Sequence, residues 1–214
     1  MQRNLCGRTL GDMTDEQPEQ PTRERRVLDV AALRALGHPL RMRIFDILSQ
    51  HGPQTSSTLA ELTGESSGST SYHLRILAKQ ELIREIPERS TGRERWWERP
   101  KGSTAWGDTD DTRSPAGRAA LQAATSEFHR LRNEETLDFF TRRADREPEE
   151  WRDVASSFTT TARMTPAQLA EIADQIEALI TAAGERYRDQ EGEDVRSVTI
   201  RADLFPLRQL GGAS

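Results

Sequence analysis

Residues 58–100 constrain the fold of this chain more than any other segment. The segment opens with a short amphipathic stretch that ends at Gly64, passes through a polar turn into a second amphipathic stretch, and closes with two short β-type runs. Gly92 lies between these two runs, where a β-hairpin needs its turn. Two helices joined by a short turn and followed at once by a hairpin leave few folds open, because each element must bury its apolar side against the others.

The residues before this segment extend the helical plan. Apolar residues recur at helical spacing from Val27 to Leu36, and the recurrence stops before a glycine. Pro39 suits the first turn of the next helix, and serines stand where they can cap the two helices of the segment. Residues 27–102 therefore predict a winged helix-turn-helix, a module whose second helix enters the DNA major groove while the hairpin touches the flanking backbone.

The helix expected at residues 68–80 has one apolar side and one polar side. Leu74 and Leu77 supply the side that packs inward. The other side carries hydroxyl, imidazole and cationic groups that can reach base edges or phosphate oxygens. The candidate DNA contacts on and beside this helix are Ser67, Ser69, Thr70, Tyr72, His73, Arg75 and Lys79. For Tyr72 and His73 a position in the core is an equal alternative.

The expected hairpin, or wing, spans residues 84–99 and carries a second set of candidate contacts. Its tip and return strand offer guanidinium and hydroxyl groups suited to phosphate or minor-groove contact. The candidates are Arg89, Thr91, Arg93 and Arg95. Trp96 and Trp97 are adjacent on a strand and must face opposite sides, so one of them should pack under the hairpin.

The net charge of −5 is not evenly distributed along the chain. Residues 27–101 hold 11 Lys/Arg against 9 Asp/Glu, a balance of +2, and the rest of the chain holds 19 against 26, a balance of −7. A local positive field is what a DNA-binding face requires, while the remainder repels the phosphates. Nearly all of the basic residues are arginine, which indicates a GC-rich bacterial genome.

The stretch 28–101 resembles the ArsR-like winged-helix transcriptional regulators. The resemblance rests on ALGHPLRMRIFDIL, TSYHLRILAKQELI and GRERWW. It implies a homodimeric bacterial repressor that binds a roughly palindromic operator of double-stranded DNA and releases it when an effector binds. Together with the arginine bias, it indicates an actinobacterial source. Glu81 departs from the pattern, because such sequences often have glycine there, and should alter how the second helix ends.

The sequence offers little for catalysis, metal binding or membrane insertion. The chain lacks the paired thiolates of arsenic-sensing relatives, and its four histidines do not fall at ligand spacing. No nucleophile–base pair or phosphate-binding glycine loop is recognisable, so we expect no enzyme, no cofactor and no metal. With a single cysteine, Cys6, and no apolar run near the ~20 residues of a membrane span, the expected location is the cytoplasm, at the nucleoid.

The C-terminal half predicts a second unit with two long helices, at 115–145 and 166–188, and strands at 157–164 and 195–205. Their apolar stripes favour dimerisation across a two-fold axis. The expected dimer contacts are Leu121, Phe128, Leu169, Ile172, Ile176 and Leu179. Aromatic residues between helices and strands suggest a pocket for a small-molecule effector, with plain core packing as the alternative: Phe128, Phe139, Phe140, Trp151 and Phe158.

The expected fold class is therefore mainly α with small β, with an N-terminal winged helix-turn-helix domain and a C-terminal helical α+β domain. The expected organisation is a tail at 1–26, the winged domain at 27–102, a linker at 103–114, the dimerisation and possible effector domain at 115–207, and a tail at 208–214. The expected function is sequence-specific DNA binding in transcription regulation. The alternative is a winged-helix protein-interaction adaptor with no DNA site of its own.

Overall fold

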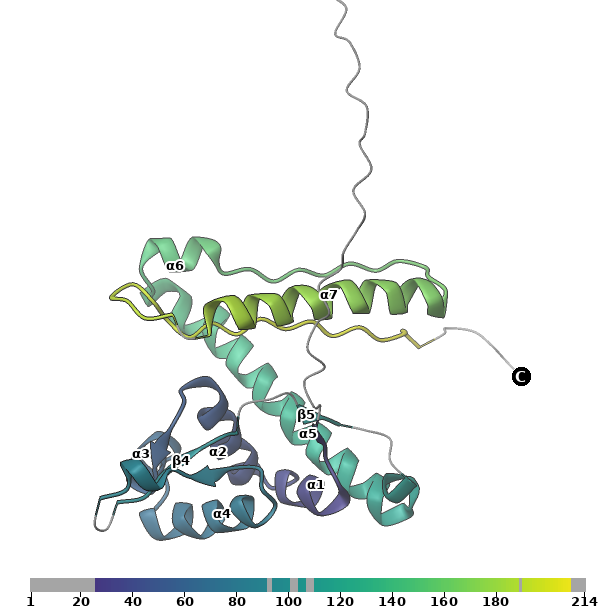
Figure 1. Ribbon diagram of the computed structural model, residues 1–214. Helices are drawn as coiled ribbons and strands as arrows, with labels where there is room; N and C mark the ends of the chain where they lie inside the picture. Colours follow the sequence, from purple (N-terminus) through teal and green to yellow (C-terminus); the bar gives the residue numbers. More distant parts are fainter. Residues whose placement is uncertain (1–25, 92–93, 101–103, 107–109, 189, 209–214) are drawn as a thin grey trace, which may run out of the picture.

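A computed structural model describes residues 26–91, 94–100, 104–106, 110–188 and 190–208 (Figure 1). These residues are mainly helical with a small antiparallel sheet, which confirms the expected fold class. No helix in these ranges is long and apolar enough to cross a bilayer. The wing candidate Arg93, the lone Cys6 and all but one residue of each expected tail lie outside the described residues.

Four helices form the N-terminal domain (residues 26–100): α1 Val30–Leu36, α2 Pro39–Gln50, α3 Ser56–Thr63 and α4 Ser67–Lys79. At the start of each helix, a side chain accepts a hydrogen bond from one of the backbone N–H groups that have no partner within the helix. In α2 the first residue is a proline, which has no N–H group to satisfy. Asp29 accepts from the N–H of Ala32 at 2.7 Å, and Pro39 opens α2 as the sequence predicts. Gly64, at φ +73°, ends α3 in the left-handed conformation that glycine adopts without strain.

A three-stranded antiparallel sheet closes the N-terminal domain. The strands are β2 Gln54–Thr55, β3 Arg84–Glu85 and β4 Trp96–Glu98, in the order β2-β4-β3. The β3–β4 pair is the predicted hairpin, while β2 was not expected. Trp97 is buried in the core and Trp96 lies half-buried on the other side of β4, as adjacent residues of a strand must.

The long helix α5 (Pro115–Asp138) begins at the cap Ser114 and continues as a π-helical turn at Phe139–Arg143 and a short 3-10 helix at Ala144–Arg146. Its first half packs along α1, and Ala124 and Leu131 belong to the same core as the leucines of α1. Part of α5 therefore packs on the core of the N-terminal domain, and the domain division before residue 115 stays a prediction.

The expected linker at 103–114 contains short regular elements. Strand β5 (Thr104–Ala105) pairs in parallel with β1 (Arg26–Val27), and residues Asp110–Arg113 form a 3-10 helix. The Trp106 ring packs against Phe128 of α5, with centroids 4.9 Å apart. These contacts attach the segment to the N-terminal domain and to the first half of α5.

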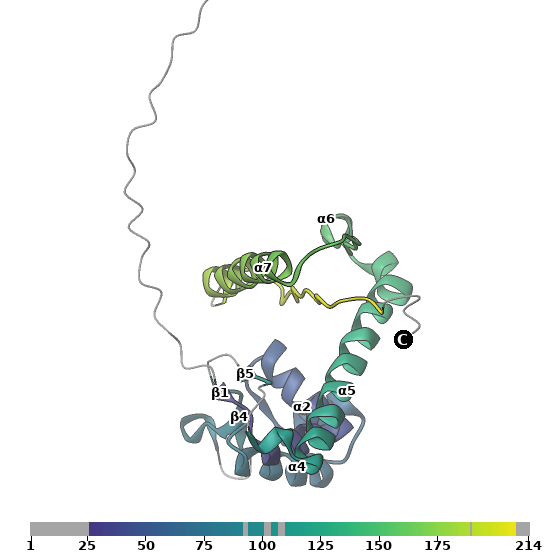
Figure 2. The same ribbon diagram turned by 90° about the vertical axis from the view of Figure 1, so that its right-hand side faces the viewer.

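Beyond α5, α6 (Glu149–Val154) and α7 (Pro166–Tyr187) are joined by an extended stretch. The predicted capping box is confirmed, since Thr165 accepts from the N–H of Gln168 at 3.3 Å and the Gln168 side chain accepts from the N–H of Thr165 at 3.0 Å. No side chain of α7 is buried. Figures 1 and 2 show α7 standing apart from α1–α4.

The strands expected at 157–164 and 195–205 are absent, and that prediction is wrong for the described chain. Both segments are extended, but neither joins a sheet, and nearly all of their side chains are exposed. Alternating apolar residues indicate an extended segment with one side to bury. They do not supply the neighbouring strand whose hydrogen bonds define a β-strand.

Candidate nucleic-acid interface

The inner side of α4 fixes its place in the N-terminal domain. Leu74 and Leu77 are fully buried, as expected, and so is Thr70. The Thr70 hydroxyl donates to the carbonyl of Ser56 on α3 at 2.8 Å, which ties the two helices together. Thr70 is therefore a core residue that cannot meet a base edge, and its assignment as a DNA contact is wrong.

His73 also faces inward. Its ring lies 4.7 Å from that of His38, at the start of α2, and Tyr72 packs edge-on against it at 5.2 Å. Burial, with the neighbouring His38 and Arg41, lowers the pKa of His73. A neutral, buried imidazole makes no phosphate contact, so the core alternative holds for His73.

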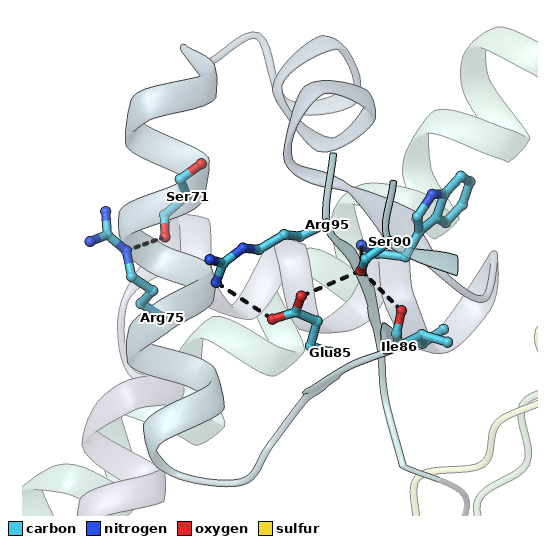
Figure 3. Close-up of polar contacts among 7 residues, drawn as sticks. Ser71, Arg75, Glu85, Ile86, Ser90 and Arg95 are labelled. Carbon is cyan, nitrogen blue, oxygen red and sulfur yellow. Dashed lines mark hydrogen bonds and ion pairs between the residues drawn. The ribbon is translucent and has the colours of Figure 1, made fainter. Parts of the chain in front are cut away.

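The outer side of α4 carries the remaining candidates. Ser67, Arg75 and Lys79 are exposed, and Ser69 is half-buried with its N–H bonded to the cap Ser66 at 3.1 Å. Tyr72 is 56% exposed, which places its phenol outside the core. Arg75 donates from Nε to the carbonyl of Ser71 at 3.1 Å, so its terminal guanidinium nitrogens extend outward (Figure 3).

The wing is built by a compact set of hydrogen bonds. The N–H of Ile86 donates to the carbonyl of Trp96 at 2.8 Å, and Thr91 and Glu94 exchange two backbone bonds of 3.1 and 3.2 Å near the tip. The Ser90 hydroxyl donates to the carbonyl of Ile86 at 3.0 Å and to Glu85 at 3.3 Å. These bonds hold the chain on both sides of the tip in one conformation.

Three wing candidates lie within the described residues, and all are exposed: Arg89, Thr91 and Arg95. Figure 3 shows the Arg95 guanidinium pointing toward α4, with Glu85 as its ion-pair partner at 3.5 Å. Arg89 lies over the Trp96 ring at 5.9 Å. Within the described chain Arg75, Lys79 and Arg89 form no ion pair, so their charges are available to an anionic partner.

The C-terminal end of α4 is held by the start of the described chain. Arg26 donates to the carbonyls of Gln80 and Glu81, at 2.7 and 2.5 Å. Glu81 has φ +53°, the left-handed conformation that normally favours glycine. Glu81, where the ArsR-like sequences often have glycine, therefore lies in the turn between α4 and β3, in a backbone conformation that glycine adopts more easily.

The comparisons with known proteins bear on this surface. The model of a family described as Helix-turn-helix domain matches residues 36–86, which run from the end of α1 to the residue after β3. The chain contains a helix-turn-helix domain. The hairpin that follows adds a wing to it, although the wing's second strand lies beyond the match.

Solved structures overlap the chain only loosely. The adhesin competence repressor AdcR from Streptococcus pyogenes has a TM-score of 0.31 and 18% identity, covering 69% of this chain and 82% of its own. Rv1404 from Mycobacterium tuberculosis has a TM-score of 0.29 and 18% identity, and the match covers 72% of this chain and 82% of Rv1404. The transcriptional regulator Tm0710 from Thermotoga maritima has a TM-score of 0.28 and 11% identity, and the match covers 74% of this chain and 90% of Tm0710. Overlaps this low carry no conclusion, and no curated protein matches the sequence.

The expected dimer contacts divide into two groups. Leu121 and Phe128 pack half-buried against the core of the helix-turn-helix domain. On α7, Leu169, Ile172 and Ile176 are only half-buried, and Leu179 is 70% exposed. The apolar residues still without a covering surface are thus those of α7.

The expected effector aromatics do not converge on one cavity. Phe128 lies between Trp106 and the Arg132 guanidinium, and Phe139 packs edge-on against Phe140 at 5.1 Å. Trp151 lines an open hollow with Glu150, Val154 and Asp194. Phe158 is 90% exposed. In the described chain the aromatic pocket is not formed, and this prediction is not supported.

A polar cluster that the sequence did not reveal joins the helix-turn-helix domain to the C-terminal segment. Gln50 of α2 donates to Asp46 at 2.8 Å and to Glu135 of α5 at 2.7 Å. Arg201, from the C-terminal segment, donates to the Thr136 hydroxyl at 2.5 Å and approaches Glu135 at 4.0 Å. We call Asp46, Gln50, Glu135 and Arg201 the carboxylate cluster.

Within the carboxylate cluster, Asp46 has a raised pKa. Burial and the neighbouring Glu135 raise the pKa of Asp46 to about 6, against the opposing effect of Arg132 and Arg201. No group of three or more potential metal ligands occurs in the described ranges. The cluster joins Gln50 to Glu135, 85 residues further along the chain, so no local motif could have predicted it.

Proposed function

We propose that this chain is a sequence-specific DNA-binding transcriptional regulator of ArsR-like type, acting as a repressor in the bacterial cytoplasm. In this proposal α4 enters the major groove and the wing, residues 84–99, follows the flanking backbone. The observation that carries it is that Arg75 and Lys79 on α4 and Arg89 on the wing are all exposed cations of a helix-turn-helix domain. Both ribbon views place α4 and the hairpin on the side opposite α7 (Figures 1 and 2).

The proposal includes a homodimer on an approximately palindromic operator. Two-fold related α4 helices would lie about 34 Å apart, one turn of DNA. Support comes from α7, which has an apolar stripe over 22 residues and no buried side chain. A helix of this kind needs a covering surface, and a second copy supplies an identical one. A small-molecule effector remains part of the proposal as a means of releasing DNA.

The test is a mobility-shift assay with the DNA upstream of the protein's own gene, in the presence of competitor DNA. Arg75→Ala should reduce the preference for the operator over competitor, because a base contact worth about 1–3 kcal/mol is lost. Arg89→Ala and Arg93→Ala should weaken binding to all sequences and each reduce the salt slope by about 1. Arg142→Ala, at an exposed arginine of the π-helical turn that follows α5, is the matched control.

An unchanged salt slope in both wing variants would remove the wing from the interface. Failure to shift any DNA would favour the adaptor alternative, in which the same cationic surface binds an acidic protein. The dimer has its own test, because Ile176→Asp places a charge in the α7 stripe and should dissociate the dimer in sedimentation velocity. An Ile176→Asp variant that stays dimeric would exclude the α7 stripe as the interface.

A further inference from the structure

The C-terminal segment 196–204 has one side attached and one side open. Arg201 is half-buried and bonds to Thr136 of α5. Val198 and Ile200 are 65% and 57% exposed. Because successive side chains of an extended chain point to opposite sides, Val198 and Ile200 lie on the side opposite Arg201. At the start of the segment Arg196 bonds to Glu147 at 2.8 Å, so the open apolar side begins after it.

The backbone of this segment is also unpartnered. Within the described residues, no backbone hydrogen bond joins 196–204 to another part of the chain, and the same holds for 157–164. An exposed extended segment with apolar alternation and free N–H and C=O groups is an edge that pairs readily with another chain. Figure 1 shows both segments running along α7, so three uncovered elements lie together.

The uncovered apolar surface is large enough for a stable interface. Seven large apolar residues of α7, of residues 157–164 and of the C-terminal residues 196–207 have more than half of their surface exposed: Phe158, Leu179, Tyr187, Val198, Ile200, Phe205 and Leu207. At roughly 100 Å² for each residue they present roughly 700 Å², close to the ~800 Å² that each partner contributes to a standard protein–protein interface.

We propose that residues 196–204 pair in antiparallel fashion with the same residues of a second copy, and that α7 and residues 157–164 complete this interface. The inference rests on the proposed homodimer and specifies how it is built. Antiparallel pairing of a segment with itself is two-fold symmetric, so it closes at two copies and satisfies the backbone groups along the paired edge of each segment. A second copy therefore matches the segment in both hydrogen bonding and apolar surface.

Cysteine scanning of the full-length protein tests the pairing directly. In a Cys6→Ser background, single cysteines are placed at each position from 197 to 203 and mildly oxidised. Residues opposite each other in an antiparallel pair have Cα atoms about 4.5–5.5 Å apart, within reach of a disulfide. Covalent dimer should peak at one position and fall off within two residues on either side. Glu61→Cys, on the exposed side of α3, is the control that should not cross-link.

Sedimentation of charged variants is the second measurement. Ile200→Asp should raise the dimer dissociation constant at least about 100-fold, because it brings two carboxylates into the interface. Val154→Asp makes the same kind of change at an exposed residue of α6 and should leave the dimer intact. Far-ultraviolet circular dichroism confirms that both variants remain folded, as expected for exposed positions.

The outcomes separate this inference from the proposed function. A dimeric wild type whose Ile200→Asp variant stays dimeric, with no peak in the cysteine scan, overturns the pairing and leaves DNA binding and dimerisation standing. A monomeric wild type overturns the pairing and the homodimer together, and leaves the surface for another occupant. Failure of the wild type to shift DNA counts against the regulator proposal, whatever the sedimentation shows.

Discussion

Replacing Asp46 with asparagine should make the protein relatively more stable as the pH rises. Asp46 lies on α2 beside Glu135, and Gln50 donates to both carboxyl groups. Asparagine has nearly the same shape, can accept from Gln50 and donate to Glu135, and cannot ionise. The substitution therefore removes a titrating group while leaving the hydrogen bonds of the carboxylate cluster possible.

The sign follows from the raised pKa of Asp46, which lies at about 6 in the folded protein against an ordinary value of 3.8. Below pH 3.8 the carboxyl is protonated in both folded and unfolded chains. Between pH 3.8 and about 6 the unfolded chain ionises first, so stability falls as the pH rises, and above about 6 the loss is complete. Full burial would make this loss roughly 3 kcal/mol, and partial contact with solvent reduces it to about 1–2 kcal/mol.

The assay is thermal unfolding of wild type and Asp46→Asn at pH 4.5, 5.5, 6.5 and 8. About two-thirds of this loss falls between pH 4.5 and 8, so the difference in Tm between the two proteins should shift by about 1–5 °C in favour of the variant, given about 2–4 °C per kcal/mol for a chain of this size. Asp145→Asn, at an exposed residue after α5, should show a constant difference. A constant difference for Asp46→Asn as well would refute the reasoning, because it would mean that Asp46 ionises normally in the folded protein.

Two further predictions concern packing around Gly117 and Thr70. Gly117→Ala should destabilise the protein by about 2–3 kcal/mol in denaturant titrations, since the new Cβ would lie 2.6 Å from the Cα of Thr112. Gly184→Ala, in open space on α7, should instead stabilise by up to about 1 kcal/mol, and equal effects would contradict the packing argument. Thr70→Val should cost about 1–2 kcal/mol by leaving the Ser56 carbonyl without its donor, while the folded variant keeps its DNA affinity. Lost affinity at unchanged stability would restore Thr70 to the DNA surface.

Local signals were sufficient to predict the helices of the N-terminal domain, the long helices α5 and α7, and the hairpin, but not the short helix α6. Pro39 opens α2, Ser66 caps α4, and Thr165 with Gln168 forms the box that starts α7. Each signal acts through backbone groups within one turn of the residue itself, so it is readable without tertiary structure. The pairing of β3 with β4 follows for the same reason, because a short connection brings the two strands together.

The sequence alone could not predict which way a side chain points or which distant residue it contacts. Thr70 looks like an exposed polar residue, yet its hydroxyl can bond a carbonyl of the preceding helix and so be buried without cost. The two-residue strand β2 is too short to show any periodicity. For residues 157–164 and 196–204, the alternation predicts an extended chain correctly but contains nothing about what pairs with it.

The carboxylate cluster connects these uncovered segments to the DNA-binding surface. Arg201 holds residues 196–204 against α5 through Thr136 and approaches Glu135, which shares Gln50 with Asp46 on α2. The charge of Arg201 also lowers the pKa of Asp46, against burial and Glu135. By linkage, a rearrangement that withdraws Arg201 must favour the protonated form of Asp46, and protonation of Asp46 must in turn weaken the hold on Arg201. The position of the C-terminal segment and the protonation of Asp46 are therefore coupled. Because α2 packs directly on α4, the contacts that carry this coupling continue to the helix proposed to enter DNA.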